Sequence, residues 1–358
     1  MTTTSRNDSL LNKVAGIIPA IEGSAPVEAI KKALGGEPPS ADPDMQVVLD
    51  MLGSLSGKPI EELSPEEARQ QPTPTDAVKK ILSDNGHPPR AQLFTSTTIS
   101  IPGGPLGSVP AQVYTPIVGD GPFPVILYFH GGGFVIADTK TYEGSIIALA
   151  QGVQAIVVSL DYHQAPEHQF PTQPNEAFAA YQWLLAHAEE INGDRKRIAV
   201  AGESAGGNLA AVVSLMARDK DVTLPVHQLL IYPLVNNNVF NSSYIDNANA
   251  KPLNAAMMNW FFKHYSEPID AYSSYALPDK ASSLKDLPPA TVITAEIDPL
   301  YEEGKEFAER LESDGVPVAY RHYTGVTHEF FGMADVVAKA REAQAFAIGE
   351  LKKAFAAN

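Results

Sequence analysis

A serine flanked by glycines, between a strand-like run and a helix-like run, constrains the fold of this chain more than any other feature. The apolar run 197–201 ends at Gly202, and good helix formers begin at Asn208, with Gly202-x-Ser204-x-Gly206 between them. A strand that turns sharply into a helix strains its apex residue and brings the flanking Cα atoms close together, so the flanking positions need residues without a Cβ. The sequence therefore predicts a strand–turn–helix unit with the Ser204 hydroxyl at its tip, beside the free N–H groups of a helix N-terminus.

Strand-like and helix-like patterns alternate through the rest of the chain from about residue 96. Several of the strand-like runs are continuously apolar, which is typical of a parallel sheet covered by helices on both faces. We therefore predict an α/β fold. The expected strands are 97–101, 111–115, 124–129, 155–160, 197–201, 228–232, 290–295 and 318–323, and the expected helices are 142–151, 175–187, 208–218, 302–313 and 336–355.

Two stretches depart from this alternation. Short amphipathic helices are expected within residues 44–85, one of them opened by a capping box from Ser64 to Glu67, and such helices need a surface to lie on. The stretch 236–275 is an insertion after a strand, where open α/β sheets bind ligands. We expect its aromatic group 260–262 to pack within the inserted segment rather than line a pocket. Residues 1–40 show helical spacing at Leu10, Val14 and Ile21 and little else.

Composition excludes several classes of protein. The net charge of −16 argues against nucleic acid and anionic membranes as partners. The absence of cysteine excludes disulfides, a thiol nucleophile and thiolate metal sites, and the nine histidines are not spaced as a metal-binding pair. No run approaches 18 apolar residues, and Leu10-Leu11 is broken by Asn12-Lys13, so we expect no bilayer span and no secretory leader. A cytoplasmic location is predicted, or a periplasmic or secreted one if a signal peptide has been removed.

A run of three glycines offers a way to bind a negative charge. His130-Gly131-Gly132-Gly133-Phe134, here called the glycine loop, follows the strand expected at 124–129. Consecutive glycines lose much backbone entropy on folding, but their N–H groups can approach a developing oxyanion, joined by the N–H of Ala205. The alternative is a flexible or phosphate-binding loop. The G-x-G-x-x-G spacing of dinucleotide sites is absent, which favours the first interpretation.

A nucleophilic serine also needs a base and an acid that orients the base. His328 lies just after the last expected strand, at the sheet edge that also carries Ser204. Asp298 follows the strand expected at 290–295 and precedes Pro299, with Glu296 as the rival acid. We prefer Asp298 because it stands in the loop itself. The order Ser204, Asp298, His328 is the one expected of an α/β-hydrolase.

Together these motifs resemble those of the bacterial hormone-sensitive-lipase-like (family IV) esterases. The segment 161–171, with Asp161-Tyr162 and Ala165-Pro166-Glu167-His168, matches a further signature of that family, and the resemblance covers roughly residues 40–358. It implies an α/β-hydrolase fold with an eight-stranded, mostly parallel sheet, helices on both faces and a helical cap. It also implies hydrolysis of short to medium acyl esters without a cofactor, an oxyanion hole of Gly132, Gly133 and Ala205, and a homodimer through the last strand.

On this basis the chain divides into four parts. Residues 1–92 are the N-terminal extension and cap helices, 93–235 the first part of the catalytic core, 236–279 the cap insertion and 280–358 the second part of the core. His130, Gly131, Glu203 and Asp161 are expected to support the site, with Asp161 and Glu167 orienting loops and doing no chemistry. Phe134 and Phe330 are expected to line the substrate pocket.

Two positions depart from the family pattern. Glu203 stands where many members have Asp, which suggests a different network beneath the nucleophile. His163 stands where members usually have Arg, which leaves open whether the ion pair of that arginine is retained.

The sequence therefore predicts a serine carboxylesterase with the catalytic residues Ser204, Asp298 and His328 and no metal. An amidase or deacetylase would use the same residues, so that alternative stays open. A small-molecule receptor on the same fold is a further alternative, and the presence of all three residues argues against it.

Overall fold

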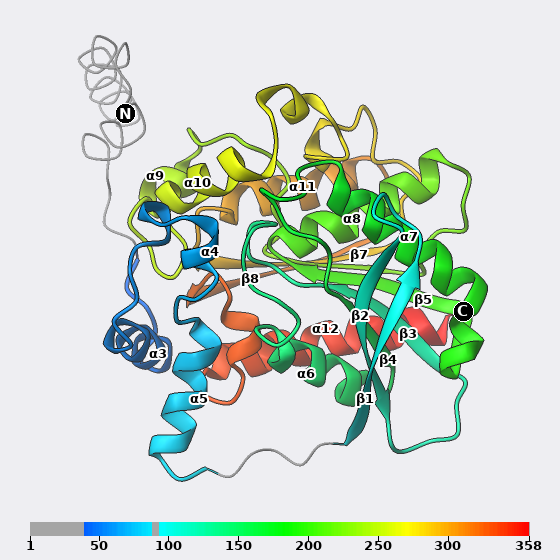
Figure 1. The fold of residues 1–358 in the computed structure, drawn as a ribbon, viewed down its shortest axis with the longest axis horizontal. Helices are drawn as coiled ribbons and strands as arrows, with labels where there is room; N and C mark the ends of the chain where they lie inside the picture. The colour runs from blue at the N-terminus through cyan, green and yellow to red at the C-terminus, as the bar shows by residue number, and fades with distance from the viewer. Residues whose placement is uncertain (1–38, 88–92, 358) are drawn as a thin grey trace, which may run out of the picture.

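The computed structural model describes residues 39–87 and 93–357 and is built around one eight-stranded sheet (Figure 1). The strand order is β1-β2-β4-β3-β5-β6-β7-β8. β2 runs antiparallel to both β1 and β4, and every other neighbouring pair is parallel. The strands are β1 Phe94–Pro102, β2 Ser108–Pro116, β3 Phe123–Phe129, β4 Ile156–Leu160, β5 Gly193–Glu203, β6 Gln228–Ile231, β7 Ala290–Ile297 and β8 Val318–Thr327.

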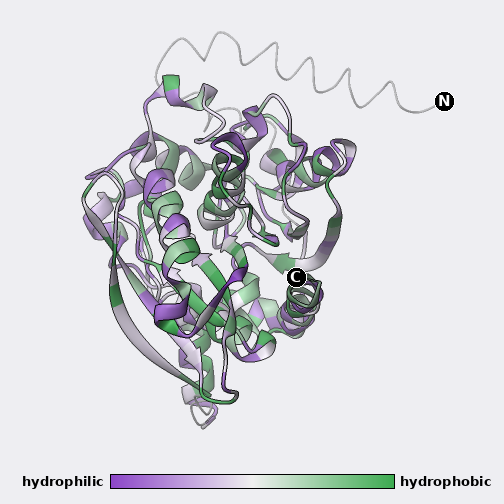
Figure 2. Cartoon of the chain, turned by 90° about the vertical axis from the view of Figure 1, so that its right-hand side faces the viewer, coloured by the Kyte–Doolittle hydropathy of each residue, from purple (hydrophilic) through white to green (hydrophobic). Residues whose placement is uncertain are grey.

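Helices cover both faces of this sheet. α7 (Thr172–His187), α8 (Ala205–Asp219) and α11 (Tyr301–Ser313) pack on one face, and α6 (Glu143–Val153) and α12 (Ala338–Ala356) pack on the other (Figure 1). The two apolar cores lie between these layers, which explains why the central strands are apolar on both sides. All five residues of β4 are buried, and α8 is buried from Ala205 to Ala217. Figure 2 shows the hydrophobic colour concentrated on the strands at the centre.

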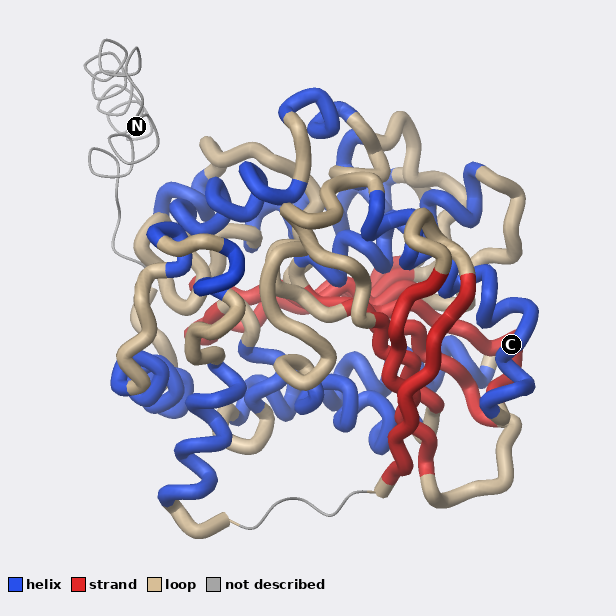
Figure 3. Tube along the Cα trace, in the orientation of Figure 1, coloured by secondary structure: helices blue, strands red, loops and turns tan. Residues whose placement is uncertain are grey.

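Two groups of short helices lie over the end of the sheet where the parallel strands finish, around Ser204 and His328. Residues 39–87, here the N-terminal covering segment, contain α3 (Pro43–Ser54), η2 (Ile60–Glu62), α4 (Pro65–Ala68) and α5 (Pro74–Asp84). Residues 236–279, the inserted covering segment, contain α9 (Ser242–Asp246), α10 (Ala255–Tyr265) and η4 (Pro268–Tyr272). Loops take up much of both segments (Figure 3). The indole N–H of Trp260 in α10 donates to the carbonyl of Leu63 at 3.0 Å, so the two segments contact each other.

The sequence-based expectations for these elements are largely confirmed. All eight strands are present, β8 lies at one edge of the sheet, and Ser64 and Glu67 form the expected capping box. β8 continues to Thr327, beyond the expected 318–323, and α8 begins at Ala205 rather than 208 because the helix starts directly after the turn. The helical spacing in residues 1–38 lies outside the described residues. None of the described helices has the length and hydrophobicity that crossing a bilayer requires.

Candidate active site

Ser204 occupies the sharp turn between β5 and α8 that the sequence predicts. Its φ of 58° and ψ of −119° are strained values for a residue with a Cβ. A Cβ at Gly202 would overlap the backbone of Gly206, and one at Gly206 would overlap the carbonyl of Phe129. Glycine is therefore required at both flanking positions, and the turn holds the Ser204 side chain at the wall of a cavity.

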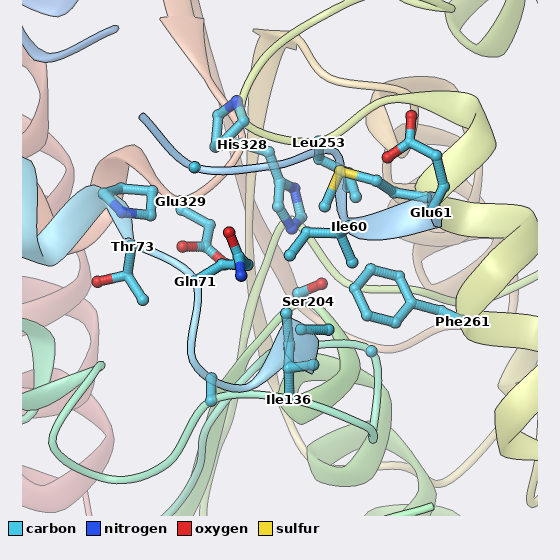
Figure 4. A pocket seen from close by; sticks show the side chains of 18 of the residues that line it. Ile60, Glu61, Gln71, Thr73, Ile136, Ser204, Leu253, Phe261, His328 and Glu329 are labelled. Carbon is cyan, nitrogen blue, oxygen red and sulfur yellow. The ribbon is translucent and has the colours of Figure 1, made fainter. Parts of the chain in front are cut away.

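His328 follows β8 directly and pairs with the carboxylate of Asp298. Their Nδ1 and Oδ2 atoms are 2.7 Å apart, and both side chains are buried. Burial alone would lower the pKa of His328, but the charge and hydrogen bond of Asp298 outweigh it and raise this pKa above its ordinary value of 6.5. His328 lines the same cavity as Ser204, and its imidazole points toward the serine hydroxyl (Figure 4).

The structure separates the two candidate acids. Asp298 accepts the backbone N–H of Leu300 at 2.8 Å with one oxygen and faces His328 with the other. Glu296 accepts the backbone N–H of Gly325 at 2.7 Å and so holds the segment that leads to His328. Asp298 is the acid in contact with the imidazole.

The glycine loop adopts backbone angles that glycine alone accepts easily. Gly132 and Gly133 have φ values of 94° and 59°. A Cβ on Gly133 would overlap the ring of Phe261 in α10, and a Cβ on Gly132 would overlap the carbonyl of Ile136. Both glycines line the cavity with Ser204. Ala205, the first residue of α8, lies directly after the serine at the helix N-terminus, where backbone N–H groups are free.

The cavity has a volume of about 740 Å³ and is lined by both covering segments as well as by the core. Apolar side chains from the covering segments make up a large part of its wall, among them Leu49, Leu52, Ile60, Leu253, Met257, Met258, Phe261 and Phe262. Phe261 and Phe262 therefore face the cavity, which corrects the expectation that residues 260–262 serve only internal packing. Trp260, by contrast, is buried and donates to Leu63 of the N-terminal covering segment, so it serves packing rather than the cavity wall.

One of the two phenylalanines expected in the pocket lies there. Phe134 lines the cavity and stacks on Tyr265 of α10, with ring centroids 3.8 Å apart. Phe330 does not line it, and the expectation is wrong. Glu329 has a φ of 67°, and this left-handed turn after His328 directs Phe330 into the core against Tyr232 and Tyr323.

Glu203, at the position that departs from the family pattern, contacts two buried tyrosines. Its carboxylate, on the residue before Ser204, accepts hydrogen bonds from the hydroxyls of Tyr128 and Tyr232. Burial raises the pKa of Glu203 to about 7, although these hydrogen bonds act in the opposite direction. The Tyr142 hydroxyl donates to Glu329 at 2.6 Å beside this group. No motif or spacing in the sequence connects these tyrosines to Ser204, so they could not be predicted.

The other residues predicted to support the site make contacts with neighbouring loops. The ring of His130 stacks on Tyr162, and its Nδ1 lies 2.8 Å from the carbonyl of Gly131, which steadies the glycine loop. Asp161 accepts the N–H and hydroxyl of Thr139. His163 Nδ1 lies 2.7 Å from the fully buried carboxylate of Glu176, so a histidine makes a carboxylate contact at the position where the family usually has arginine.

Comparisons with known proteins identify the family to which the chain belongs. The family model described as the alpha/beta hydrolase fold matches residues 126–332. The chain is 38% identical to the esterase LipI of Mycobacterium tuberculosis over 75% of this chain and 85% of LipI, and 35% identical to the carboxylesterase NlhH of the same species over 89% and 98%. The solved structure of a hyperthermophilic esterase from Pyrobaculum calidifontis is similar with a TM-score of 0.78 and 35% identity, covering 88% of this chain and 99% of that one.

The chain therefore belongs to the α/β-hydrolase fold family, among the hormone-sensitive-lipase-like esterases. It is a carboxylic ester hydrolase that acts on small-molecule esters.

Proposed function

We propose that the protein hydrolyses carboxylic esters through a covalent acyl-enzyme on Ser204. The Ser204 Oγ attacks the ester carbonyl carbon while His328 accepts its proton, and Asp298 holds the imidazole in the required tautomer. The backbone N–H groups of Gly132, Gly133 and Ala205 stabilise the negative charge on the former carbonyl oxygen. The carbon–oxygen bond to the alcohol then breaks, His328 gives the proton to the departing alkoxide, and water releases the acid by the same steps.

One observation carries this proposal. His328, held by its buried 2.7 Å contact with Asp298, lines the same cavity as Ser204 and the glycine loop. The proposed nucleophile, base and N–H donors therefore surround one cavity. Such an arrangement converts the weakly nucleophilic hydroxyl into an effective one.

The cavity supports esters of short to medium acyl length as substrates. A cavity of about 740 Å³, with apolar side chains from both covering segments along much of its wall, accommodates a small ester. We propose that the N-terminal and inserted covering segments act together as the cap over this cavity, within the boundaries 1–92 and 236–279.

The homodimer and the cytoplasmic location remain predictions. The position of β8 at the edge of the sheet supports dimerisation through this strand, because an edge strand has unpaired N–H and C=O groups. Light scattering at micromolar concentration tests the dimer, and a monomeric mass contradicts it.

The decisive experiment is a series of p-nitrophenyl esters from acetate to palmitate, run beside the corresponding anilides. We expect the highest kcat/KM within the short to medium esters and little turnover of anilides. A fluorophosphonate should label Ser204 and abolish hydrolysis. Labelling elsewhere without loss of activity would remove the basis of the assignment, and preferred turnover of anilides would favour the amidase alternative.

A further inference from the structure

The side chain of Arg69 joins the N-terminal covering segment to the core beside the glycine loop. Arg69 follows α4, and its Nε donates to the carbonyl of Val135 at 2.8 Å while Nη2 donates to the carbonyl of Ala165 at 2.9 Å. Nη1 and Nη2 also reach the two carboxylate oxygens of Glu167, each at 2.7 Å. One guanidinium from the covering segment therefore binds three acceptors on two loops of the core.

The two backbone acceptors belong to the structure that sets the glycine loop. The N–H groups of Val135 and Ile136 both donate to the carbonyl of Gly132, at 3.0 and 2.9 Å, and the N–H of Ala165 donates to the carbonyl of Phe134 at 2.9 Å. Val135 and Ala165 are both 0% exposed with Arg69 in place, so the guanidinium covers their carbonyl oxygens and supplies donors in fixed directions. Removal of the guanidinium would leave these two acceptors without a fixed partner, within the turn that orients Gly132 and Gly133.

The chemistry of the site requires arginine. Its planar fork places several donors in fixed directions, which matches two carbonyls and a carboxylate at once, whereas lysine offers one compact charge. The hydrogen bond from Arg69 lowers the pKa of Glu167 to about 2, so Glu167 remains ionised at every working pH. The Glu167 side chain is 55% exposed, so the ion pair serves to orient the guanidinium more than to stabilise the fold.

We propose that Arg69 is a positioning residue for ester hydrolysis. Its hydrogen bonds hold the glycine loop from the N-terminal covering segment, so the orientation of the oxyanion hole depends on how that segment packs on the core. This inference rests on the proposed role of Gly132 and Gly133. It differs from a role in substrate binding, which would act on KM, and from a role in cap stability alone, which would act on Tm.

The consequences can be separated kinetically. If the glycine loop loses its orientation, the N–H groups no longer meet the oxyanion, and this interaction is formed only in the transition state. We expect Arg69→Ala to lower kcat about 10- to 100-fold with KM changed by less than about threefold, since loss of one oxyanion donor costs about 100- to 1,000-fold. Arg69→Lys should show most of the same loss. Glu167→Gln should lose only about threefold, because Arg69 keeps both backbone acceptors.

The test compares these three variants with the wild type and with Arg195→Ala. Arg195 also pairs with a glutamate, Glu189, at 3.2 Å, but both side chains are more than half exposed, so this variant controls for the loss of an arginine–glutamate pair. The measurements are kcat and KM on p-nitrophenyl butyrate and the inhibition constant of an alkyl boronic acid, whose tetrahedral adduct carries an oxygen in the oxyanion position. Boronate affinity should fall in parallel with kcat/KM. Guanidinium ion at millimolar concentration should restore part of the kcat of Arg69→Ala, which sodium chloride should not.

Several outcomes would overturn the inference. An unchanged kcat in Arg69→Ala, or a rise confined to KM, shows that Arg69 does not position the glycine loop. If Arg69→Ala does not fold by near-UV circular dichroism, Arg69→Lys decides, and full kcat with unchanged boronate affinity in that variant rejects the proposal. Failure of the proposed function looks different, because wild type and Arg195→Ala would then lack esterase activity or Ser204 labelling.

Discussion

The hydroxyl of Tyr232 donates a hydrogen bond to the buried carboxylate of Glu203, the residue before Ser204. The ring of the same tyrosine lies 4.6 Å from the imidazole of His328, measured between centroids. Tyr232 thus connects the residue that precedes Ser204 to the base that we assign to it. The protonation state of Glu203 therefore bears on both the stability of the fold and the surroundings of His328.

The first prediction concerns Glu203 and the pH dependence of stability. Its pKa of about 7 in the fold lies above the ordinary value of 4.5, so between these pH values the native state binds more protons than the unfolded state, and stability falls as pH rises. The difference corresponds to on the order of 3 kcal/mol at most. Glu203→Gln cannot ionise, so it should not show this loss. The unfolding free energy of the variant in urea, minus that of the wild type, should therefore increase as the pH rises from about 4.5 to 7.

A matched control for this prediction is Glu309→Gln, which changes a side chain that is 62% exposed in α11. This variant should follow the wild type at every pH. Parallel stability curves for Glu203→Gln and the wild type would show that Glu203 ionises in the fold as an ordinary carboxyl group does.

The second prediction concerns the pH dependence of activity. His328 must be neutral to accept the serine proton, so kcat/KM should increase with pH through an apparent pKa above 6.5 and then reach a plateau. Asp298 is the main cause that raises this pKa, so the residual activity of Asp298→Asn should titrate at lower pH than the wild type. A profile that declines between pH 6 and pH 8 is incompatible with His328 as the base.

The sequence predicts the sheet and the reacting groups because both have short-range signatures. Continuous apolar runs reveal the parallel strands, and Ser204, Asp298 and His328 each stand directly after a strand in the expected order. The three glycines of the loop are visible as a run. These features depend on neighbours within a few residues, which a single sequence displays.

Contacts across long distances in the sequence could not be predicted. Arg69 reaches Val135 and Glu167 across 66 and 98 residues, with no periodicity or motif to reveal it. The left-handed turn at Glu329 directs Phe330 into the core, and a positive φ at a glutamate is not something the sequence predicts. The contact of Phe261 with Gly133 depends on how α10 lies over the core, which local propensity does not determine.

The third prediction concerns the contact between α10 and the glycine loop. Gly133→Ala should lower kcat by on the order of 100-fold, because the new Cβ overlaps the Phe261 ring and the backbone angle disfavours alanine. Gly315→Ala is the matched control, since Gly315 also has a positive φ, of 87°, but has no atom within 4 Å of a Cβ. The control should lose stability in a Tm measurement and keep its kcat. Equal kcat values for the two variants would contradict the prediction.

The fourth prediction concerns the nucleophile. Ser204→Ala should lose roughly a million-fold in kcat, the scale observed when a catalytic triad loses its serine. The fold should survive, because the Ser204 side chain accepts no capping hydrogen bond from α8. Stopped assays with concentrated enzyme measure the residual rate, and near-UV circular dichroism checks the fold. Retention of more than about a hundredth of the activity would require another nucleophile.

The last prediction separates the two acids at the carboxyl end of β7. Asp298→Asn should keep the fold but stabilise the wrong imidazole tautomer, at a cost approaching roughly 10,000-fold in kcat. Glu296→Gln should cost far less, because Glu296 accepts the N–H of Gly325 and an amide oxygen can accept the same bond. Each change removes one negative charge near the carboxyl end of β7, so the comparison controls for charge. If Glu296→Gln proves the more damaging change while Asp298→Asn stays active, the acid is misassigned, although Ser204 and His328 keep their roles.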